Sequence, residues 1–267
     1  LTAKDGAAGM YHNFRGVGNK ITAPNGSEPT GAIAASGNNL YILGNELTDI
    51  GFPGTSKLYH PIYVQSAESC SGPRLPTETN RELAWNYLHD NFSYDGINIY
   101  RECGSSAYMT DHRVHDNFIE NQTGCGIRIG DYVTGENWIY NNILLNAGLG
   151  PNPTGDEAMH VPVLIHAGWD DTTTTIHFYN NTIYGGGFTG GAAWASSMVG
   201  FSNSHPYTLD FRNNIIVSTV PGITYLNAAL WQPTGAQRNL WYGAGTAPLW
   251  DNNSINADPL FANNQSQ

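Results

Sequence analysis

Three short segments in the first half of the chain combine a strand-like alternation with polar side chains that could do chemistry. The segments are 60–64 (HPIYV), 96–100 (GINIY) and 126–130 (GIRIG). In each one an apolar residue recurs at every second position, which turns one side toward a core and the other side outward. The outward residues of the three segments are Tyr63, Asn98, Tyr100 and Arg128.

This set of residues fits the β-elimination of an acidic sugar polymer. That reaction needs a cation or amide to neutralise the carboxylate, a base for the C5 proton and an acid for the leaving oxygen. Arg128 or Arg101 could pair with the carboxylate in a bidentate manner, and Asn98 could assist. Tyr100 or His60 could be the base if the arginines lower its pKa. The alternative is that these residues only cover a sheet surface.

The candidates for substrate binding are two of these outward residues and four polar residues near the ends of strands. They are Tyr63, Asn98, Asp95, Glu102, Asp131 and His166. Hydrolysis of a glycoside needs two carboxylates across the scissile bond. The outward positions carry none, and only Asp95 and Asp131 at the edges could serve. Elimination is therefore favoured over hydrolysis, by a narrow margin.

Metal binding has weak support. His112 and His115 are three residues apart, but a strand register turns His112 inward and His115 outward, so they should not share an ion. No cofactor is expected with certainty. Calcium could bind loop carboxylates, which occur at Asp156, Glu157, Asp170 and Asp171.

Composition narrows the class of partner. The 267 residues carry a net charge of −11, although only 12 % of them are charged. An acidic surface argues against nucleic acid, because phosphate binding needs a basic footprint. No apolar run is long enough to span a bilayer, and no signal segment opens the chain. The chain starts at Leu1 and not at a methionine, so we expect it to be processed or truncated.

A repeat of asparagine followed two places later by an apolar residue runs through the chain. Its asparagines are Asn45, Asn86, Asn117, Asn142, Asn181, Asn214 and Asn239. The residues three places before them are Ile42, Leu83, Val114, Ile139, Phe178, Phe211 and Ala236. The residues two places after them are Leu47, Leu88, Ile119, Leu144, Ile183, Ile216 and Trp241. Except for Ala236, these flanking residues are large and apolar, which predicts inward positions.

Each repeat therefore predicts a strand, an asparagine bend, a short strand, a loop and another strand. Stacked repeats of this kind form an all-β, right-handed parallel β-helix of about seven coils. Asparagine tolerates left-handed geometry at a bend, and stacked asparagines can hydrogen-bond from coil to coil. We expect one domain over 1–267, a partial coil at 1–30 and a loop excursion at 185–200. An antiparallel sandwich is the alternative, but it should show regular two-residue turns.

The chain resembles bacterial right-handed parallel β-helix proteins, including polysaccharide lyases of the alginate-lyase and chondroitinase B kind. The likeness rests on HPIYV, on the asparagine repeats followed by GINIY or GIRIG, and on NADPLF at 256–261. It implies the fold more than the activity. The lysine and arginine pair of the best-known lyases is not recoverable here. Members usually have an N-terminal helical cap and continue past NADPLF. This chain shows no amphipathic cap and ends in ANNQSQ, so we expect uncapped end coils, in a chain that is cut from a larger one or whose ends a neighbour covers.

The cysteines and a second outward surface complete the candidate features. Cys70 and Cys103 follow the same strand in successive coils, and stacking would bring them together as a disulfide, while Cys125 is expected as a buried free thiol. The strands before the asparagines carry outward rows of aromatic and charged residues. These are Tyr41, Glu82, Arg113, Trp138, His177 and Asp210, with His115, Tyr140, Tyr179 and Arg212 beside them. They could stack on sugar rings or simply pair across strands.

The sequence therefore predicts a secreted or cell-surface protein that binds and cleaves an extracellular acidic polysaccharide by β-elimination. The alternative is a non-catalytic structural β-helix, such as a fibre, tailspike or adhesin, that self-associates through its uncapped end coils.

Overall fold

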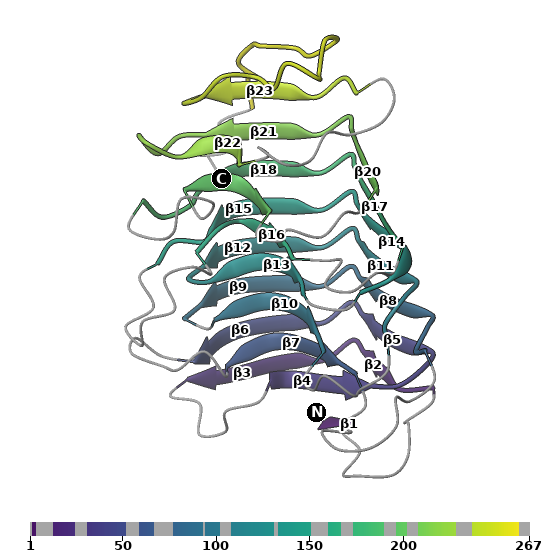
Figure 1. Ribbon diagram of the computed structural model, residues 1–267. Coiled ribbons are helices and arrows are strands. Elements are labelled where there is room, and N and C mark those ends of the chain that lie inside the picture. The colour runs from purple at the N-terminus through teal and green to yellow at the C-terminus, as the bar shows by residue number, and fades with distance from the viewer. Residues whose placement is uncertain are drawn as a thin grey trace.

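The computed structural model is an all-β solenoid in which three parallel sheets run along the coil axis (Figure 1). It describes residues 2–3, 13–24, 31–51, 59–66, 77–92, 94–101, 108–130, 133–150, 160–166, 173–189, 196–201, 208–227 and 237–261. Each strand from β1 to β19 pairs with the strand three places later in the chain, and β21 pairs with β23. This order is that of the expected right-handed parallel β-helix.

Each sheet takes one strand from each coil. Sheet A contains β1 (Thr2–Ala3), β4 (Gly31–Ser36), β7 (His60–Gln65), β10 (Asp95–Tyr100), β13 (Cys125–Ile129), β16 (Val163–Ile165), β19 (Ser197–Phe201) and β22 (Thr224–Asn227). Sheet B contains β2 (Arg15–Val17), β5 (Leu40–Leu43), β8 (Arg81–Ala84), β11 (His112–His115), β14 (Gly135–Tyr140), β17 (Thr174–Tyr179) and β20 (Thr208–Arg212). Sheet C contains β3 (Lys20–Pro24), β6 (Glu46–Gly51), β9 (Tyr87–Asn91), β12 (Phe118–Gln122), β15 (Ile143–Ala147), β18 (Thr182–Gly186), β21 (Ile215–Ser218) and β23 (Leu240–Gly243).

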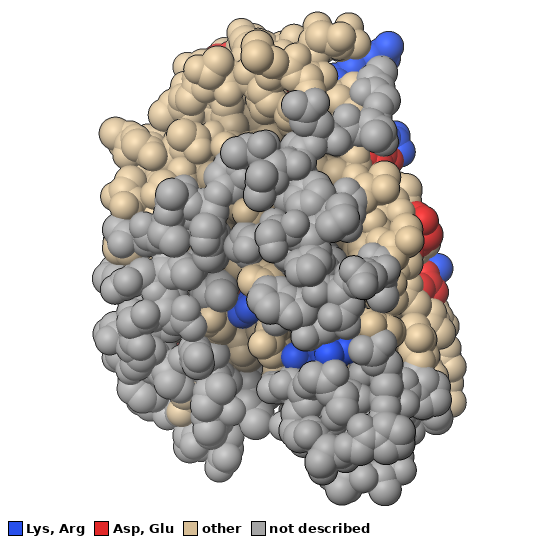
Figure 2. Space-filling model, in the orientation of Figure 1, with Lys and Arg blue, Asp and Glu red and all other residues tan. Residues whose placement is uncertain are grey.

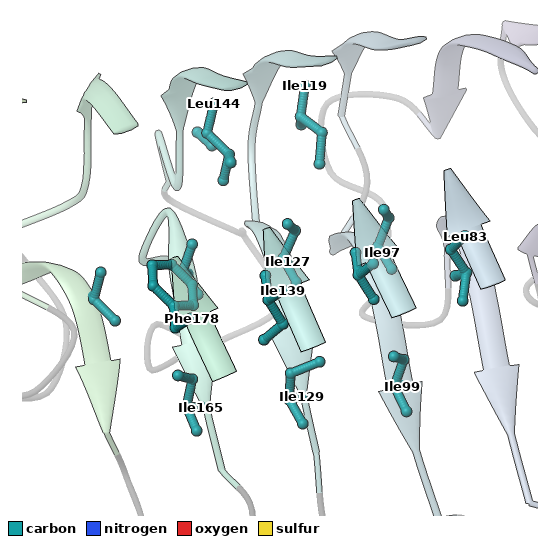
Figure 3. Close-up of a cluster of buried hydrophobic side chains, with 14 of the residues drawn as sticks. Leu83, Ile97, Ile99, Ile119, Ile127, Ile129, Ile139, Leu144, Ile165 and Phe178 are labelled. Carbon is teal, nitrogen blue, oxygen red and sulfur yellow. The ribbon is translucent and has the colours of Figure 1, made fainter. Parts of the chain in front are cut away.

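The apolar core fills the inside of the coils. Ile97 pairs in register with Ile127, and Ile99 with Ile129, and all four are fully buried. Figure 3 shows these side chains pointing into the same interior as Leu83, Ile119 and Phe178 from the other sheets. All the inward residues predicted beside the asparagines are buried, except Ala236, which lies outside the described residues.

The asparagines form the predicted ladder. The Nδ2 of Asn117 donates to the Oδ1 of Asn142 at 2.9 Å and to the carbonyl of Leu83 at 2.9 Å. The Oδ1 of Asn117 accepts from the Nδ2 and the backbone N–H of Asn86. The same contacts recur up the stack, so each buried amide is satisfied. Asn19 is one further rung, because its Nδ2 donates to Asn45 Oδ1 at 2.8 Å.

The left-handed residue at the bend is not the asparagine, as the sequence had suggested, but the residue directly before it. These residues have positive φ: Gly18, Gly44, Trp85, Asp116, Asn141, Asn180, Asn213 and Arg238. The physical reason is that two adjacent residues have different roles at the corner. The left-handed residue turns the chain, and the ladder asparagine that follows points inward to bond its neighbours.

Two boundaries differ from the sequence expectations. Residues 1–30 contribute β1, β2 and β3 to all three sheets, so they form more than a partial coil. The excursion expected over 185–200 is too long, because β18 continues to Gly186 and Ser197–Phe201 forms β19. The glycine-rich sequence around β19 predicted a loop instead of a strand. In the structure, Val199 of β19 pairs with Val163 and with Leu226.

The C-terminal coil is covered, in contrast to the expected uncapped end. Trp250 packs against Phe211 and Trp241, with ring centroids 6.0 and 6.3 Å apart. The carboxylate of Asp251 accepts from Asn239 Nδ2 at 2.9 Å, at the place where another ladder residue would stand. Among the described residues, no helix is long and apolar enough to cross a membrane.

Candidate functional site

A polar cluster lies on the outer face of sheet A, where β7, β10 and β13 run side by side. Tyr63 pairs in register with Asn98, and Asn98 with Arg128, so the three predicted outward residues occupy one row across three coils. Successive strands are about 4.8 Å apart, which places the row within the length of about two sugar units. His60 and Asp95 begin β7 and β10 and join the same cluster.

The cluster is held together by contacts from His60, Asp95 and Arg128. The Nδ1 of His60 is 3.9 Å from Asp95 Oδ2, and Arg128 is 3.6 Å from the same oxygen. The Nδ2 of Asn98 lies 3.5 Å from His60 Nε2. The ring of His60 stacks on Tyr63 with centroids 4.8 Å apart. These contacts join residues from three successive coils on the outer face of sheet A.

Two aromatic rings enclose the guanidinium of Arg128. Its Cζ is 5.0 Å from the centre of the Tyr100 ring and 6.0 Å from that of Tyr94. Tyr94 also meets His60 edge to face at 5.5 Å. Sequence reasoning missed Tyr94, because it stands directly before β10 and outside the alternating segment. Its position beside Asp95 at a strand start was the available signal.

Burial sets the charges of the cluster. His60 and Asp95 expose 4 % and 0 % of their surfaces, and Arg128 exposes 6 %. Burial, reinforced by the charge of Arg128, lowers the pKa of His60 to about 3, so its imidazole is neutral. Burial raises the pKa of Asp95 to about 6, against the opposing effect of Arg128. Asp95 is fully covered, and in this arrangement it lies against His60 and Arg128.

The cluster is covered and not an open groove, although its residues project outward from the coil. Tyr63 exposes 8 % and Asn98 exposes 3 % of their surfaces. Figure 2 shows basic side-chain atoms on this face, while acidic and basic side chains alternate along the edge formed by sheet B. Among the described residues, Asn98 Oδ1, Gln65 Oε1 and Ser36 Oγ are buried without a hydrogen-bond partner. Such orphaned acceptors on one outer face leave bonding capacity for a polar ligand.

The other predicted residues either have contacts of their own or lie outside the described residues. Arg101 lies over the ring of Tyr108, with its Cζ 5.6 Å from the ring centre. His166 follows β16, and its backbone N–H donates to Ile129 one coil earlier. Glu102 and Asp131, the cysteines Cys70 and Cys103, and the calcium candidates Asp156, Glu157, Asp170 and Asp171 lie outside the described residues.

The thiol of Cys125 is fully buried, as expected. Asp95 is its partner in register on β10. Burial and the neighbouring carboxylate raise the pKa of Cys125, so it is not a nucleophile. Within the part of the chain that the structure describes, no group of histidine, cysteine and carboxylate residues has the geometry to hold a metal ion.

These geometric features can be set beside known proteins. No family model, curated protein or solved structure matches this chain. The resemblance to polysaccharide lyases therefore rests on the sequence features alone.

The outer face of sheet B uses its aromatic rings on each other. His115 stacks on Tyr140, and Tyr140 on Tyr179, with centroids 4.6 and 5.2 Å apart and planes within 6° and 9°. Arg212 covers the free face of Tyr179 at 4.8 Å. Because the ring faces are occupied, the stack exposes edges, and cross-strand pairing explains this ladder better than sugar stacking does.

A cavity of about 740 Å³ lies at the C-terminal coils, away from the cluster. Tyr225, Trp241 and Tyr242 supply its aromatic lining. Its lining residues include no carboxylate, histidine, lysine or arginine. The ionisable side chains of this lining are therefore those of Tyr225 and Tyr242.

Proposed function

We propose that this protein binds an acidic polysaccharide at the sheet A cluster and cleaves it by β-elimination. The observation that carries the proposal is the convergence of Arg128, Asn98, Tyr100 and a neutral His60 on adjacent coils of a parallel β-helix. The cation and the amide match a uronate carboxylate, and the imidazole and phenol match a base and an acid. The proposed setting is extracellular, at the cell surface or secreted.

The charges of the cluster predict that substrate binding precedes proton transfer in the proposed reaction. The carboxylate of the sugar would pair with Arg128 and offset its positive charge. That charge and burial together hold the pKa of His60 at about 3, so an added anion would raise it and make His60 a stronger base. His60 would take the C5 proton, the C4–O bond would break as the C4–C5 double bond forms, and Tyr100 would protonate the leaving oxygen.

The experiment follows the ultraviolet absorbance of the unsaturated uronate during incubation with alginate, pectate, chondroitin or an ulvan-type polymer. The proposal expects an increase on at least one polymer that Tyr100→Phe and Asn98→Ala reduce by at least about tenfold. Arg113→Ala on sheet B is the matched control and should leave the rate unchanged. Thermal unfolding of each variant separates loss of activity from loss of fold.

A flat absorbance trace on every polymer would refute elimination. New reducing ends without the absorbance would instead indicate hydrolysis. Activity also requires the cluster to become accessible, since Asn98 and Arg128 expose only 3 % and 6 % of their surfaces.

That burial favours the second candidate, a structural β-helix without catalysis. In this case the cluster would be a polar network that fixes the register of β7, β10 and β13. Covering of the C-terminal coil by Trp250 and Asp251 removes one argument for end-to-end association at that end. Size in solution tests the candidate, because a fibre-forming protein would run as large assemblies and an enzyme would not.

A further inference from the structure

Trp85 has a backbone conformation that its residue type disfavours. Its φ is +56°, in the left-handed region where a bulky side chain is strained. At the same corner most other coils carry residues that tolerate this region, such as Gly44, Asn141 and Asn180. Trp85 and Arg238 are the two corner residues whose types disfavour this region, and backbone strain of this kind is found at functional positions.

The indole of Trp85 is also oriented differently from the aromatic rings beside it. It meets the ring of His115 at 85°, with centroids 5.2 Å apart. His115 begins the stack with Tyr140 and Tyr179, one ring per coil, in which neighbouring ring planes are within 6° and 9° of parallel. The indole of Trp85 therefore stands nearly perpendicular to the first ring of this stack. The side chain is 57 % exposed, so much of the indole faces solvent.

A strip without side chains leads up to this indole. Gly44 and Gly18 occupy the same corner one and two coils before Trp85, and both have positive φ. No atom lies within 4 Å of the place where a Cβ would stand at either glycine. Val17, directly before Gly18, is 55 % exposed and adds an apolar surface. Two coils span about 10 Å, which is the length of about two sugar units.

Two acidic side chains contact the histidine on which Trp85 packs. Glu82 Oε1 and Asp116 Oδ2 both contact the ring of His115, at 3.2 and 2.7 Å, and His115 contacts Trp85. Carboxylates accept hydrogen bonds from hydroxyl groups but repel a polyuronate. The C–H face of a pyranose is apolar and is attracted to the negative face of an indole.

We propose that Trp85 and the strip formed by Gly18 and Gly44 bind a neutral oligosaccharide that runs along the coil axis. This site is formed by the corner between sheets B and C, apart from the sheet A cluster, and does not rest on the proposed lyase activity. The strain at Trp85 is retained because the exposed indole serves this ligand.

The test measures binding of cellohexaose, mannohexaose and xylohexaose by calorimetry, with hexaguluronate as the charged comparison. Trp85→Asn places a residue that tolerates positive φ at the corner, so the melting temperature should stay equal or rise. Its binding should weaken at least about tenfold. If Trp85 had only a structural role, Trp85→Asn would lower the melting temperature and leave the affinity for the oligosaccharides unchanged.

Gly44→Asn provides a second variant that leaves Trp85 intact. Asparagine suits the positive φ of this position, and open space surrounds it, so the fold should be unchanged while the strip is blocked and binding weakens. Asn180→Asp, three coils further along the same corner, is the control and should bind like the parent. The proposal is overturned if no neutral oligosaccharide binds, if Trp85→Asn binds normally, or if only hexaguluronate binds through Trp85.

Discussion

The guanidinium of Arg81 lies 3.2 Å from the Nε2 of His112 inside the solenoid, where the neighbouring coils place apolar residues. Arg81 and His112 are partners in register, and Leu40 precedes them in the same inward row. Glu78 forms an ion pair with Arg81. On the other side of His112, the Oδ1 of Asn137 accepts a hydrogen bond from the Nδ1 of His112 at 2.7 Å. A fully buried polar chain thus crosses three coils.

Glu78→Gln should destabilise the protein strongly. It leaves the buried charge of Arg81 uncompensated, and breaking a buried pair in this way costs about 3–5 kcal/mol. The double variant Glu78→Gln with Arg81→Met should recover much of that loss, because it removes both charges. Denaturant unfolding of the two single variants and the double variant measures the coupling. Equal and additive losses would show that the pair does not act as a unit.

Acidification should destabilise the protein through its buried histidines. Burial, with Arg128 for His60 and Arg81 for His112, lowers the pKa of each to about 3, below the ordinary 6.5. The unfolded chain therefore binds protons that the folded chain does not, and stability present above pH 6.5 is lost as pH falls toward 3. Asp95 opposes this trend, because its raised pKa of about 6 gives stability that is present below 3.8 and lost above 6.

Two measurements check this expectation. Melting temperature should fall between pH 6.5 and 3, because two histidines outweigh one carboxyl group. Nuclear magnetic resonance of labelled histidine should show the imidazoles of His60 and His112 neutral at pH 5. Titration of both near pH 6.5 would contradict the buried, uncharged arrangement.

Asn117→Ala should cost about 2–4 kcal/mol, because it leaves the Asn86 amide and the Leu83 carbonyl without their partner inside the coil. Asn117→Asp should be at least as harmful, since a carboxylate cannot donate to Asn142 Oδ1. Chemical denaturation measures both. Asn253→Ala, at an exposed turn, is the control and should change stability by less than about 0.5 kcal/mol.

Cys125 should resist alkylation in the native protein. The thiol is fully buried, and its pKa is raised by burial and by Asp95, so very little thiolate is present at neutral pH. Peptide mapping by mass spectrometry after iodoacetamide treatment follows this cysteine separately from the other two. Rapid native labelling of Cys125 would show that the cluster opens readily. Such labelling would also indicate that solvent and ligands can reach His60 and Asn98.

The inward residues and the asparagine ladder could be predicted because stacking forces every coil to repeat them. Ile97 and Ile127 had to be inward, and the asparagines had to bond their neighbours. Asn19 carried the same signal, since Ile21 follows it by two places, but it lay before the region taken as repetitive. The strand at Ser197–Phe201 could not be recognised, because its flanking glycines favour a loop and its ladder partners are set by tertiary pairing.

The candidate site could be predicted only in part. Strand alternation placed Tyr63, Asn98 and Arg128 in one row, because register in a parallel sheet is fixed by the core residues beside them. Alternation says which side of a sheet a residue occupies, but not what lies over that side. For this reason the covering of the cluster, and the partnership of Asp95 with His60, became visible only in three dimensions.

The asparagine ladder also gives the solenoid an electrical direction. Every amide from Asn19 to Asn214 donates its Nδ2 toward the next coil, so the side-chain dipoles add head to tail along the axis. The positive end of this row reaches Asn239, where the carboxylate of Asp251 receives the last donated proton. The arrangement places a negative group at the donor end, as a carboxylate does at the amino end of an α-helix. A stack of flat coils has in this way acquired a polarity that its strands, paired side by side, do not provide.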